Sequence, residues 1–350
     1  MKQELTPITA VTAPDPYTYY SRLVDERPFG FDARVGAWVA ASAGAVECVL
    51  ESSAFRVRPP AEPIPPAMIG TPLGEVFGRL ARMNDGPRHA SLASTAAGLL
   101  ARWTSRDVAA VAKAAALRLA GAVVRGESDI GAYAQLVPAT TVAGLLAIDR
   151  ADAAMLVAHF AAAIAPGASA GDIARGVEAA AVLKTSLPLA LDDDAAANAL
   201  GFLFQSYDAT AAAIATTLAR LAGDDALCAS TRGDERALDA LLAKTIRDDP
   251  PVHNTRRFAA ADTRVCGESV GAGDSVFVLL AAANRDPRAE RSYAFGFGPH
   301  ACPGSSVATI VASAGVGAML DGGLDLSRVV VGGYRPSANV RMPLLATVTQ

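Results

Sequence analysis

The sequence predicts a mainly α-helical protein with small β-sheets near both ends of the chain. Alanine dominates long stretches and aromatic residues are only 6% of the 350 residues. Alanine favours helix because it loses no side-chain entropy there. Helical patterns dominate residues 73–221, and short strand-like runs stand outside that span. Hydrophobic residues make up 51% of the chain, which is enough for a large buried core.

The N-terminal part of the chain predicts short elements joined by turns. We expect a helix over 16–26, strands over 29–31 and 37–40, and a helix over 43–51. Segment 59–66 (PPAEPIPP) is expected to be loop or extended chain, because proline breaks helices. Long loops in compact domains are often functional.

Helices are expected through residues 73–221, with breaks at 165–171 and at the acidic cluster 192–194. The later elements are a helix over 238–247, strands at 264–266 and 275–279, a helix from after residue 302 to about 320, and strands at 329–331 and 342–348. We find no internal repeat and no linker, so residues 1–350 are expected to form a single domain.

Composition excludes several classes of protein. The net charge is −4 and the pI about 5.6, which offers no nucleic-acid signature. Residues 1–15 lack the apolar core of a signal peptide, and no apolar run reaches the roughly 18 residues of a membrane helix. The four cysteines are far apart and form no CxxC pair, which disfavours disulfides and structural zinc. We therefore expect a cytoplasmic, reduced protein without nucleic-acid or membrane partners.

One cysteine, Cys302, stands in an unusual loop. Gly298 and Gly304 bracket it, two prolines stiffen the loop, and His300 precedes the cysteine by two residues. A helical pattern begins directly afterwards, and free N–H groups at a helix N-terminus stabilise a thiolate. The loop thus has the local chemistry that an anionic sulfur ligand to iron needs.

The pattern Phe-x-x-Gly-x-His-x-Cys-x-Gly is filled by Phe295, Gly298, His300, Cys302 and Gly304. In this it resembles the cytochrome P-450 superfamily of haem-thiolate monooxygenases, in its soluble bacterial form. The alternative is a coincidental Gly/Pro loop around a buried cysteine, which further matches in the right order disfavour. The resemblance implies a helical domain that holds haem b between two long helices, with these five residues binding the cofactor and Cys302 ligating the iron.

Further matches cover nearly the whole chain. His89 and Arg257 resemble the family's residues that meet the haem propionates, and we expect both, with His300, to bind them. Without the cysteine motif, Arg257 would be interpreted as a surface arginine and His89 as a residue at the start of a helix. Residues 205–210 (QSYDAT) resemble the helix segment that carries the oxygen-activating residues. The candidate catalytic residues are Gln205, Asp208 and Thr210.

The sequence departs from the family in that segment. The family has an acid followed by threonine, whereas here Asp208 is followed by Ala209 and then Thr210. Adjacent helix positions differ by roughly 100°, so Thr210 cannot simply replace the missing hydroxyl. Proton delivery during oxygen activation is then expected to use Asp208, Gln205, water or the substrate.

Other departures mark a shortened member. Lys244 replaces the glutamate of a Glu-x-x-Arg pair with Arg247, so we expect Lys244 to reach solvent or Asp248 and expect Lys244→Glu to be stabilising. The meander after residue 287 and the region 149–198 are short, and Ala93 stands where arginine is common.

The leading interpretation is a monooxygenase that inserts one atom of O2 into an apolar small molecule, either a secondary metabolite or fatty-acid-like. The thiolate ligand favours O–O cleavage. Electrons are expected from a ferredoxin or flavodoxin with its reductase, because the chain has no Rossmann fingerprint and no cysteine cluster. The alternatives are a peroxide-using or non-oxygenating haem enzyme, and a degenerate haem-binding protein without catalysis.

Overall fold

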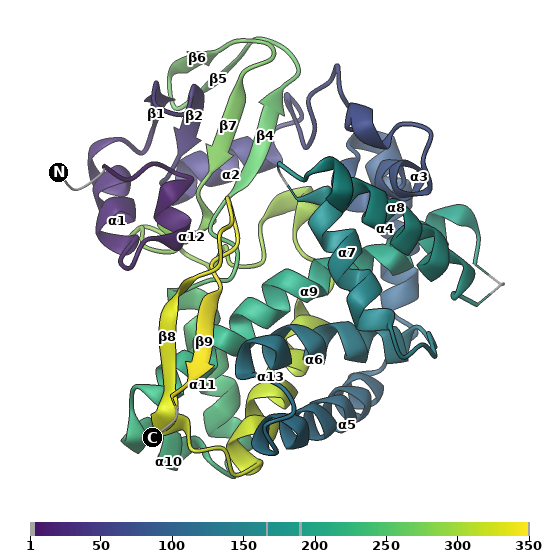
Figure 1. The fold of residues 1–350 in the computed structure, drawn as a ribbon. Coiled ribbons are helices and arrows are strands. Elements are labelled where there is room, and N and C mark those ends of the chain that lie inside the picture. The colour runs from purple at the N-terminus through teal and green to yellow at the C-terminus, as the bar shows by residue number, and fades with distance from the viewer. Residues whose placement is uncertain (1–3, 166, 189–190, 349–350) are drawn as a thin grey trace.

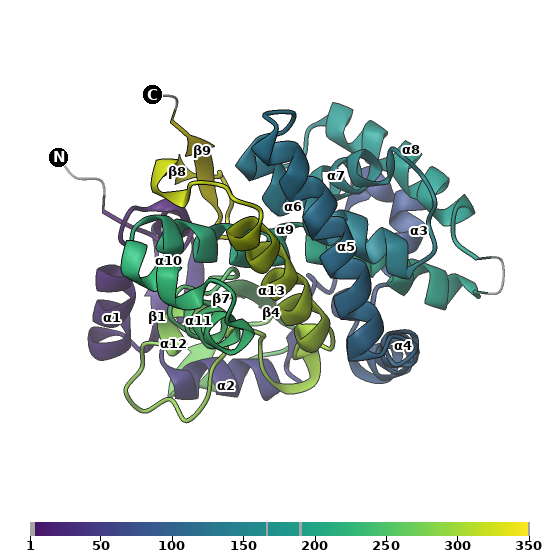
Figure 2. The same ribbon diagram turned by 90° about the horizontal axis from the view of Figure 1, so that it is seen from below.

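Long helices form the larger part of the computed structural model, which describes residues 4–165, 167–188 and 191–348. Four of them pack together: α5 (Ser105–Val124), α6 (Ile130–Leu145), α9 (Asp193–Ala222) and α13 (Ser305–Asp321). Figure 2 shows α13 beside α5, with α9 and α6 behind them. Their buried aliphatic side chains form one core, so the predicted mainly helical class is confirmed.

The remaining helices surround this group. They are α1 (Tyr17–Glu26), α2 (Ala43–Glu51), α3 (Pro72–Gly78), α4 (Gly86–Leu100), α7 (Ala153–Ile164), α8 (Ala170–Thr185), α10 (Asp225–Thr231), α11 (Glu235–Asp248) and α12 (Leu280–Ala283). Helices α7 and α8 pack against each other and occupy much of the short region 149–198. None of the helices in the described ranges is both long and apolar enough to cross a bilayer.

A mixed sheet lies at the other end of the molecule (Figure 1). Its strand order is β1 (Phe29–Asp32), β2 (Ala37–Ala40), β7 (Ser275–Val278), β4 (Thr255–Ala259) and β3 (Phe55–Arg56). Only the β2–β7 pairing is parallel. Two hairpins complete the strands: β5 (Thr263–Val265) with β6 (Glu268–Val270), and β8 (Val329–Tyr334) with β9 (Pro343–Thr347). Segments from both ends of the sequence thus share one part of the molecule.

The expected elements are present, and the structure adds several that the sequence did not predict. The apolar pattern does not predict strand β4, because two consecutive arginines interrupt it, although the family resemblance indicates a strand at Arg257. The strand is paired on both sides, with Arg257 opposite Val276 of β7. The segment 59–66 is loop up to a short 3-10 helix that begins at Pro66, as predicted.

Helix α9 starts where the acidic cluster predicted a break. The Asp192 carboxylate accepts the N–H of Ala195 at 2.8 Å, which caps the helix. Asp193 and Asp194 fill the first turn, where negative charge is stabilised by the helix dipole. The cluster therefore serves as the start of the longest helix.

Lys244 lies at the surface of α11. Its Nζ is 2.5 Å from Oδ2 of Asp248, and Nε of Arg247 is 3.3 Å from Oδ1 of the same carboxylate. The Lys244 and Arg247 side chains are 56% and 60% exposed. The expectation that Lys244 reaches solvent or Asp248 is confirmed on both counts, and one aspartate serves both cations.

This arrangement reverses the expectation that Lys244→Glu stabilises the protein. The change would gain an exposed pair with Arg247, lose the pair with Asp248 and add repulsion between two carboxylates. Each of these interactions between exposed side chains contributes about 0.3–0.5 kcal/mol to stability. We expect the free energy of unfolding, measured in urea, to fall by at most about 1 kcal/mol. Lys244→Gln is the control, because it removes the pair without the repulsion; a clear gain in stability from glutamate would contradict this account.

Candidate cofactor site

The loop that carries Cys302 is held in place by backbone contacts. Gly296 and Gly298 have φ values of +75° and +69°, which side chains other than glycine rarely adopt. A Cβ at Gly298 would also lie 3.3 Å from the carbonyl oxygen of Leu50 at the end of α2. The N–H of Cys302 donates to the carbonyl of Phe295 at 2.8 Å and closes the loop. The two glycines therefore let the loop turn tightly against α2.

Two aromatic residues join this loop to separate parts of the core. Phe295 packs against the core of the long helices, whereas Phe297 packs against the core beneath the sheet. The guanidinium of Arg291 lies 5.0 Å from the centre of the Phe297 ring. The position of Cys302 is thus fixed relative to both α13 and the sheet.

The surroundings of Cys302 differ in part from the sequence prediction. Helix α13 begins at Ser305 with Gly304 as its N-cap residue, so the sulfur lies just ahead of the helix rather than in its first turn. Burial raises the pKa of the Cys302 thiol, against the lowering effects of the Gly304 N–H and the charge of Arg82. Water can nevertheless reach Cys302, which is an exposed residue. Many protein atoms still lie around its side chain. A metal ion would have to supply the charge that removes this proton.

The two histidines predicted at the cofactor meet beside the loop. The ring centres of His89 and His300 are 4.0 Å apart. His300 Nε2 is 3.6 Å from Oδ1 of Asp85, and Oδ2 of Asp85 accepts the N–H of Val57 at 3.1 Å. Burial lowers the pKa of His89, as do the charges of His300 and Arg257, while Asp85 raises it. Residues from α4 and the cysteine loop thus form one cluster.

Arg257 belongs to the same cluster. It is only 7% exposed, so the alternative of an ordinary surface arginine is wrong. Its guanidinium donates to the carbonyl of Arg256 at 2.8 Å. Burial lowers its pKa to about 10; Asp85 acts in the opposite direction, and the charge of Arg82 adds to the lowering. Sequence reasoning missed Arg82, although an arginine three residues before Asp85, in the segment leading to His89, was a readable signal.

The cluster holds more basic groups than acidic ones. Two histidines and Arg257 lie around one carboxylate, that of Asp85. A buried cation without a carboxylate partner is costly, and a bidentate carboxylate suits an arginine. A ligand with two carboxylates and a metal beside Cys302 would balance these charges. Haem, with two propionates and an iron, fits this set of residues.

The three candidate catalytic residues lie on α9. Asp208 pairs with Arg335, just after strand β8, at 2.8 Å between Oδ1 and Nη2. Gln205 donates from Nε2 to the carbonyl of Gly201 at 2.8 Å, and Thr210 is 3% exposed. The sequence did not predict the partner of Asp208, because 127 positions separate it from Arg335.

Comparisons with known proteins support the same class. No family model matches the chain. It is 39% identical over 79 residues to the 20-oxo-5-O-mycaminosyltylactone 23-monooxygenase of Streptomyces fradiae, which covers 19% of each protein. It is 25% identical over 142 residues to the biotin biosynthesis cytochrome P450 of Bacillus subtilis strain 168, covering 37% of this chain and 36% of that protein. These matches span well under half of the relatives' length.

The likeness in structure extends over the whole chain. The crystal structure of P450BioI, in complex with an acyl carrier protein ligated to hexadec-9Z-enoic acid, matches with a TM-score of 0.78 at 19% identity. The match covers 97% of this chain and 98% of that one. The fold of the chain is that of this solved cytochrome P450. Over part of its length the chain is similar in sequence to members of the cytochrome P450 superfamily.

Replacing Arg257 by leucine should weaken haem retention. The change removes a buried guanidinium that has no carboxylate partner in the described part of the chain and would leave one propionate without its cation. We expect the haem-to-protein ratio after purification to fall severalfold. Arg256→Leu, on the neighbouring and less buried arginine, is the matched control; an equal ratio in both variants would show that Arg257 does not hold the cofactor.

Proposed function

We propose that this protein is a haem-thiolate monooxygenase that inserts one oxygen atom from O2 into an apolar small molecule. One observation carries the proposal: His89, His300 and Arg257 converge beside the loop of Cys302. These residues come from α4, the cysteine loop and β4, so only the folded chain assembles them. We further propose that residues 1–350 act as a single haem domain.

The cofactor that fits best is haem b, held without a covalent bond. Cys302 Sγ would ligate the iron, while the histidines and Arg257 would bind the propionates. Phe295, Gly298 and Gly304 would shape the loop around the sulfur. When bound, the haem supplies the chemistry that activates O2, and a thiolate ligand favours O–O cleavage.

Asp208 is the residue proposed to move a proton. Its carboxylate faces Arg335, so it must turn from the guanidinium to water before it can pass a proton onward. Gln205 is tied to the carbonyl of Gly201, and Thr210 is buried, which leaves Asp208, the carboxylate of this segment, as the proposed proton carrier. Because a threonine is missing beside Asp208, water is proposed to complete the relay.

The names of the relatives suggest the class of substrate. One relative is a mycaminosyltylactone monooxygenase, and the matched crystal structure contains a fatty acyl chain on a carrier protein. We propose a secondary metabolite or a fatty-acid-like molecule as substrate. Ferredoxin or flavodoxin, with its reductase, is the proposed electron donor.

The test compares two ways of driving the reaction. Purified protein is first reduced under carbon monoxide, where a thiolate-type haem spectrum is expected. Turnover of a panel of fatty acids and macrolides is then measured with ferredoxin or flavodoxin and reductase, or with hydrogen peroxide. We expect donor-driven turnover that Asp208→Asn lowers by about two orders of magnitude. Peroxide-only turnover would favour the peroxide-using alternative, and no turnover with intact haem would favour a degenerate protein.

A further inference from the structure

A buried asparagine interrupts the alanine run at the start of α9. Residues 195–200 have the sequence AAANAL, and Asn198 within them is only 3% exposed. Asparagine is a poorer helix former than alanine, and a buried amide costs free energy unless its polar groups are hydrogen-bonded. The helix itself does not need an amide at this position, so the partners of Asn198 show what the residue holds.

The partners of Asn198 lie mainly in the segment that precedes α4. Its Oδ1 accepts the N–H of Ala81 at 2.9 Å, and its Nδ2 donates to the carbonyl of Arg79 at 3.0 Å. The same Nδ2 donates to the carbonyl of Asp194, about one turn earlier in α9, at 2.8 Å. Both ends of the amide are therefore hydrogen-bonded, and the amide joins the backbone of 79–81 to α9.

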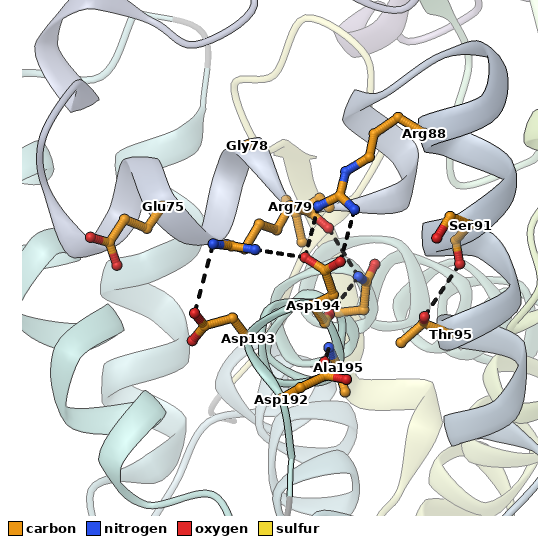
Figure 3. Close-up of polar contacts among 12 residues, drawn as sticks. Glu75, Gly78, Arg79, Arg88, Ser91, Thr95, Asp192, Asp193, Asp194 and Ala195 are labelled. Atoms are coloured by element: carbon orange, nitrogen blue, oxygen red, sulfur yellow. Dashed lines mark hydrogen bonds and ion pairs between the residues drawn. The ribbon is translucent and has the colours of Figure 1, made fainter.

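Ion pairs at the surface hold the same parts of the chain together. Figure 3 shows Arg79 and Arg88 converging on Asp194, in the first turn of α9. Nη1 of Arg79 lies 2.8 Å from Oδ1 of Asp194, and Arg88 makes two bonds of 2.8 Å to the two oxygens of that carboxylate. Because Arg88 directly precedes His89 in the first turn of α4, these pairs hold the helix beside the histidine.

A second asparagine connects the segment to the start of α4. Asn84 donates from Nδ2 to the carbonyls of Gly78 and Leu80 at 3.0 and 2.8 Å, which closes residues 78–84 into a compact turn. Leu80 is 1% exposed and belongs to the same core as the buried side chains at the start of α9. The turn is therefore fixed to α9 by the amide of Asn198 and by apolar packing.

Asp85, the next residue, directs its carboxylate away from its own helix. It is the N-cap residue of α4, yet its side chain makes no capping hydrogen bond. Its Oδ2 instead accepts the N–H of Val57 at 3.1 Å, and its Oδ1 lies 3.6 Å from Nε2 of His300. The place of this carboxylate therefore depends on the turn that carries it rather than on α4.

We propose that Asn198 is a positioning residue for the cofactor site. By fixing residues 79–84, it sets the places of Asp85 and His89 opposite His300. The proposal rests on the haem binding proposed above, although Asn198 itself acts only through the backbone and through Asn84. A buried polar network with its partners present favours one arrangement, so loss of the amide should loosen the cluster without removing any of its members.

The first test follows hydrogen–deuterium exchange in the haem-free protein. Asn198→Ala removes the amide and keeps the helix, since alanine occupies the neighbouring positions. Thr217→Val is the matched control, because it removes a buried hydrogen bond to the carbonyl of Ala213, roughly 28 Å further along α9. We expect faster exchange in peptides covering 79–92 for Asn198→Ala but not for the control. Equal exchange of these peptides in the two variants overturns the proposal.

The second test is the rate at which haem leaves the loaded protein for excess apomyoglobin. We expect Asn198→Ala to release haem about fivefold faster than Thr217→Val, as for the loss of one hydrogen bond. A double-mutant cycle with His89→Ala then shows how the effect is transmitted. If Asn198 acts by placing His89, the effect of Asn198→Ala should shrink once His89 is absent. Strictly additive effects would show a general loss of stability and overturn the proposal.

Asn198→Asp separates the two halves of the amide. Aspartate keeps an oxygen for the N–H of Ala81 but sets its other oxygen against the carbonyls of Arg79 and Asp194. Burying a carboxylate without a donor is costly, so we expect haem release at least as fast as from Asn198→Ala. Release at the wild-type rate would show that the amide is not what fixes the segment.

Failure of the proposed function would give different results. If wild type takes up no haem with a thiolate-type spectrum, the proposed function is wrong. If His89→Ala leaves the release rate unchanged, the role given to His89 is wrong. In both cases the exchange of residues 79–92 in the haem-free protein still decides whether Asn198 fixes this segment.

Discussion

Cys302→Ala should abolish thiolate-type haem absorption altogether. The alanine variant keeps the loop backbone, including the N–H bond to Phe295, but has no sulfur for the iron. His89, His300 and Arg257 would still contact the propionates, so some haem can remain bound with a different ligand. The expected result is a reduced carbon-monoxide spectrum without the thiolate band, at a haem content that falls by less than the band does.

The other cysteines provide the controls. Cys48 and Cys266 are exposed, and Cys228 lies in α10. Replacing each by alanine should leave the thiolate band unchanged, because none is in a loop with comparable contacts. A normal band in Cys302→Ala would show that another residue ligates the iron and that the central assignment is wrong.

Asp249→Asn should cost more stability than any other single change proposed here. Asp249 follows α11 and pairs with Arg341 at 3.2 Å and with His253 at 3.7 Å, and it accepts the hydroxyl of Tyr17. Arg341 is 2% exposed and His253 is fully buried. Tyr20 meets the other side of His253, with its hydroxyl 2.9 Å from Nδ1. The chain thus has a buried ionic cluster outside the cofactor site.

Removing the carboxylate leaves the charge of Arg341 without its acid. Breaking a buried ion pair by removing one partner costs about 3–5 kcal/mol, and the lower end applies because Asp249 is 23% exposed. We expect the free energy of unfolding, measured in urea, to fall by about 3 kcal/mol. Asp248→Asn, one residue away on exposed pairs, should cost less than about 1 kcal/mol. Similar losses in the two variants would contradict the account of a buried cluster.

The same cluster predicts how stability depends on pH. Burial raises the pKa of Asp249, but the nearby His253, the hydrogen bond from Tyr17 and the charge of Arg341 outweigh this and hold it below its usual value. Burial lowers the pKa of His253, although Asp249 raises it. In both cases the unfolded chain binds more protons, so stability falls with falling pH: below about 6.5 through His253 and again below about 4 through Asp249. Asp249→Asn should remove the second step.

The sequence predicted the fold because the features that define it are local. The glycines around Cys302, the alanine-rich helices and the prolines of 59–66 each specify their own backbone. The convergence of His89 with His300 was predicted only through the family resemblance, since 211 positions separate them. That these residues bind haem remains a prediction.

Contacts between distant segments could not be predicted from the sequence. Nothing in the local pattern indicated that Arg335 would pair with Asp208. The thiol of Cys302 was expected to ionise readily, but its pKa depends on atoms packed around it from other elements, and burial raises it. Pairings and desolvation of this kind depend on the finished packing, which no local pattern encodes.

Arg341 also has a consequence for how the chain is made. Its guanidinium donates to the carbonyls of Val11, Ala13 and Pro14 at 3.0, 2.7 and 3.2 Å, across as many as 330 positions. During synthesis at about 5–20 residues per second, those carbonyls remain without this hydrogen-bond donor for roughly tens of seconds. Contacts between such distant segments form slowly, and apolar surface stays exposed to solvent until they have formed. Nascent chains halted before Arg341 should therefore be the ones that chaperones hold and proteases cut.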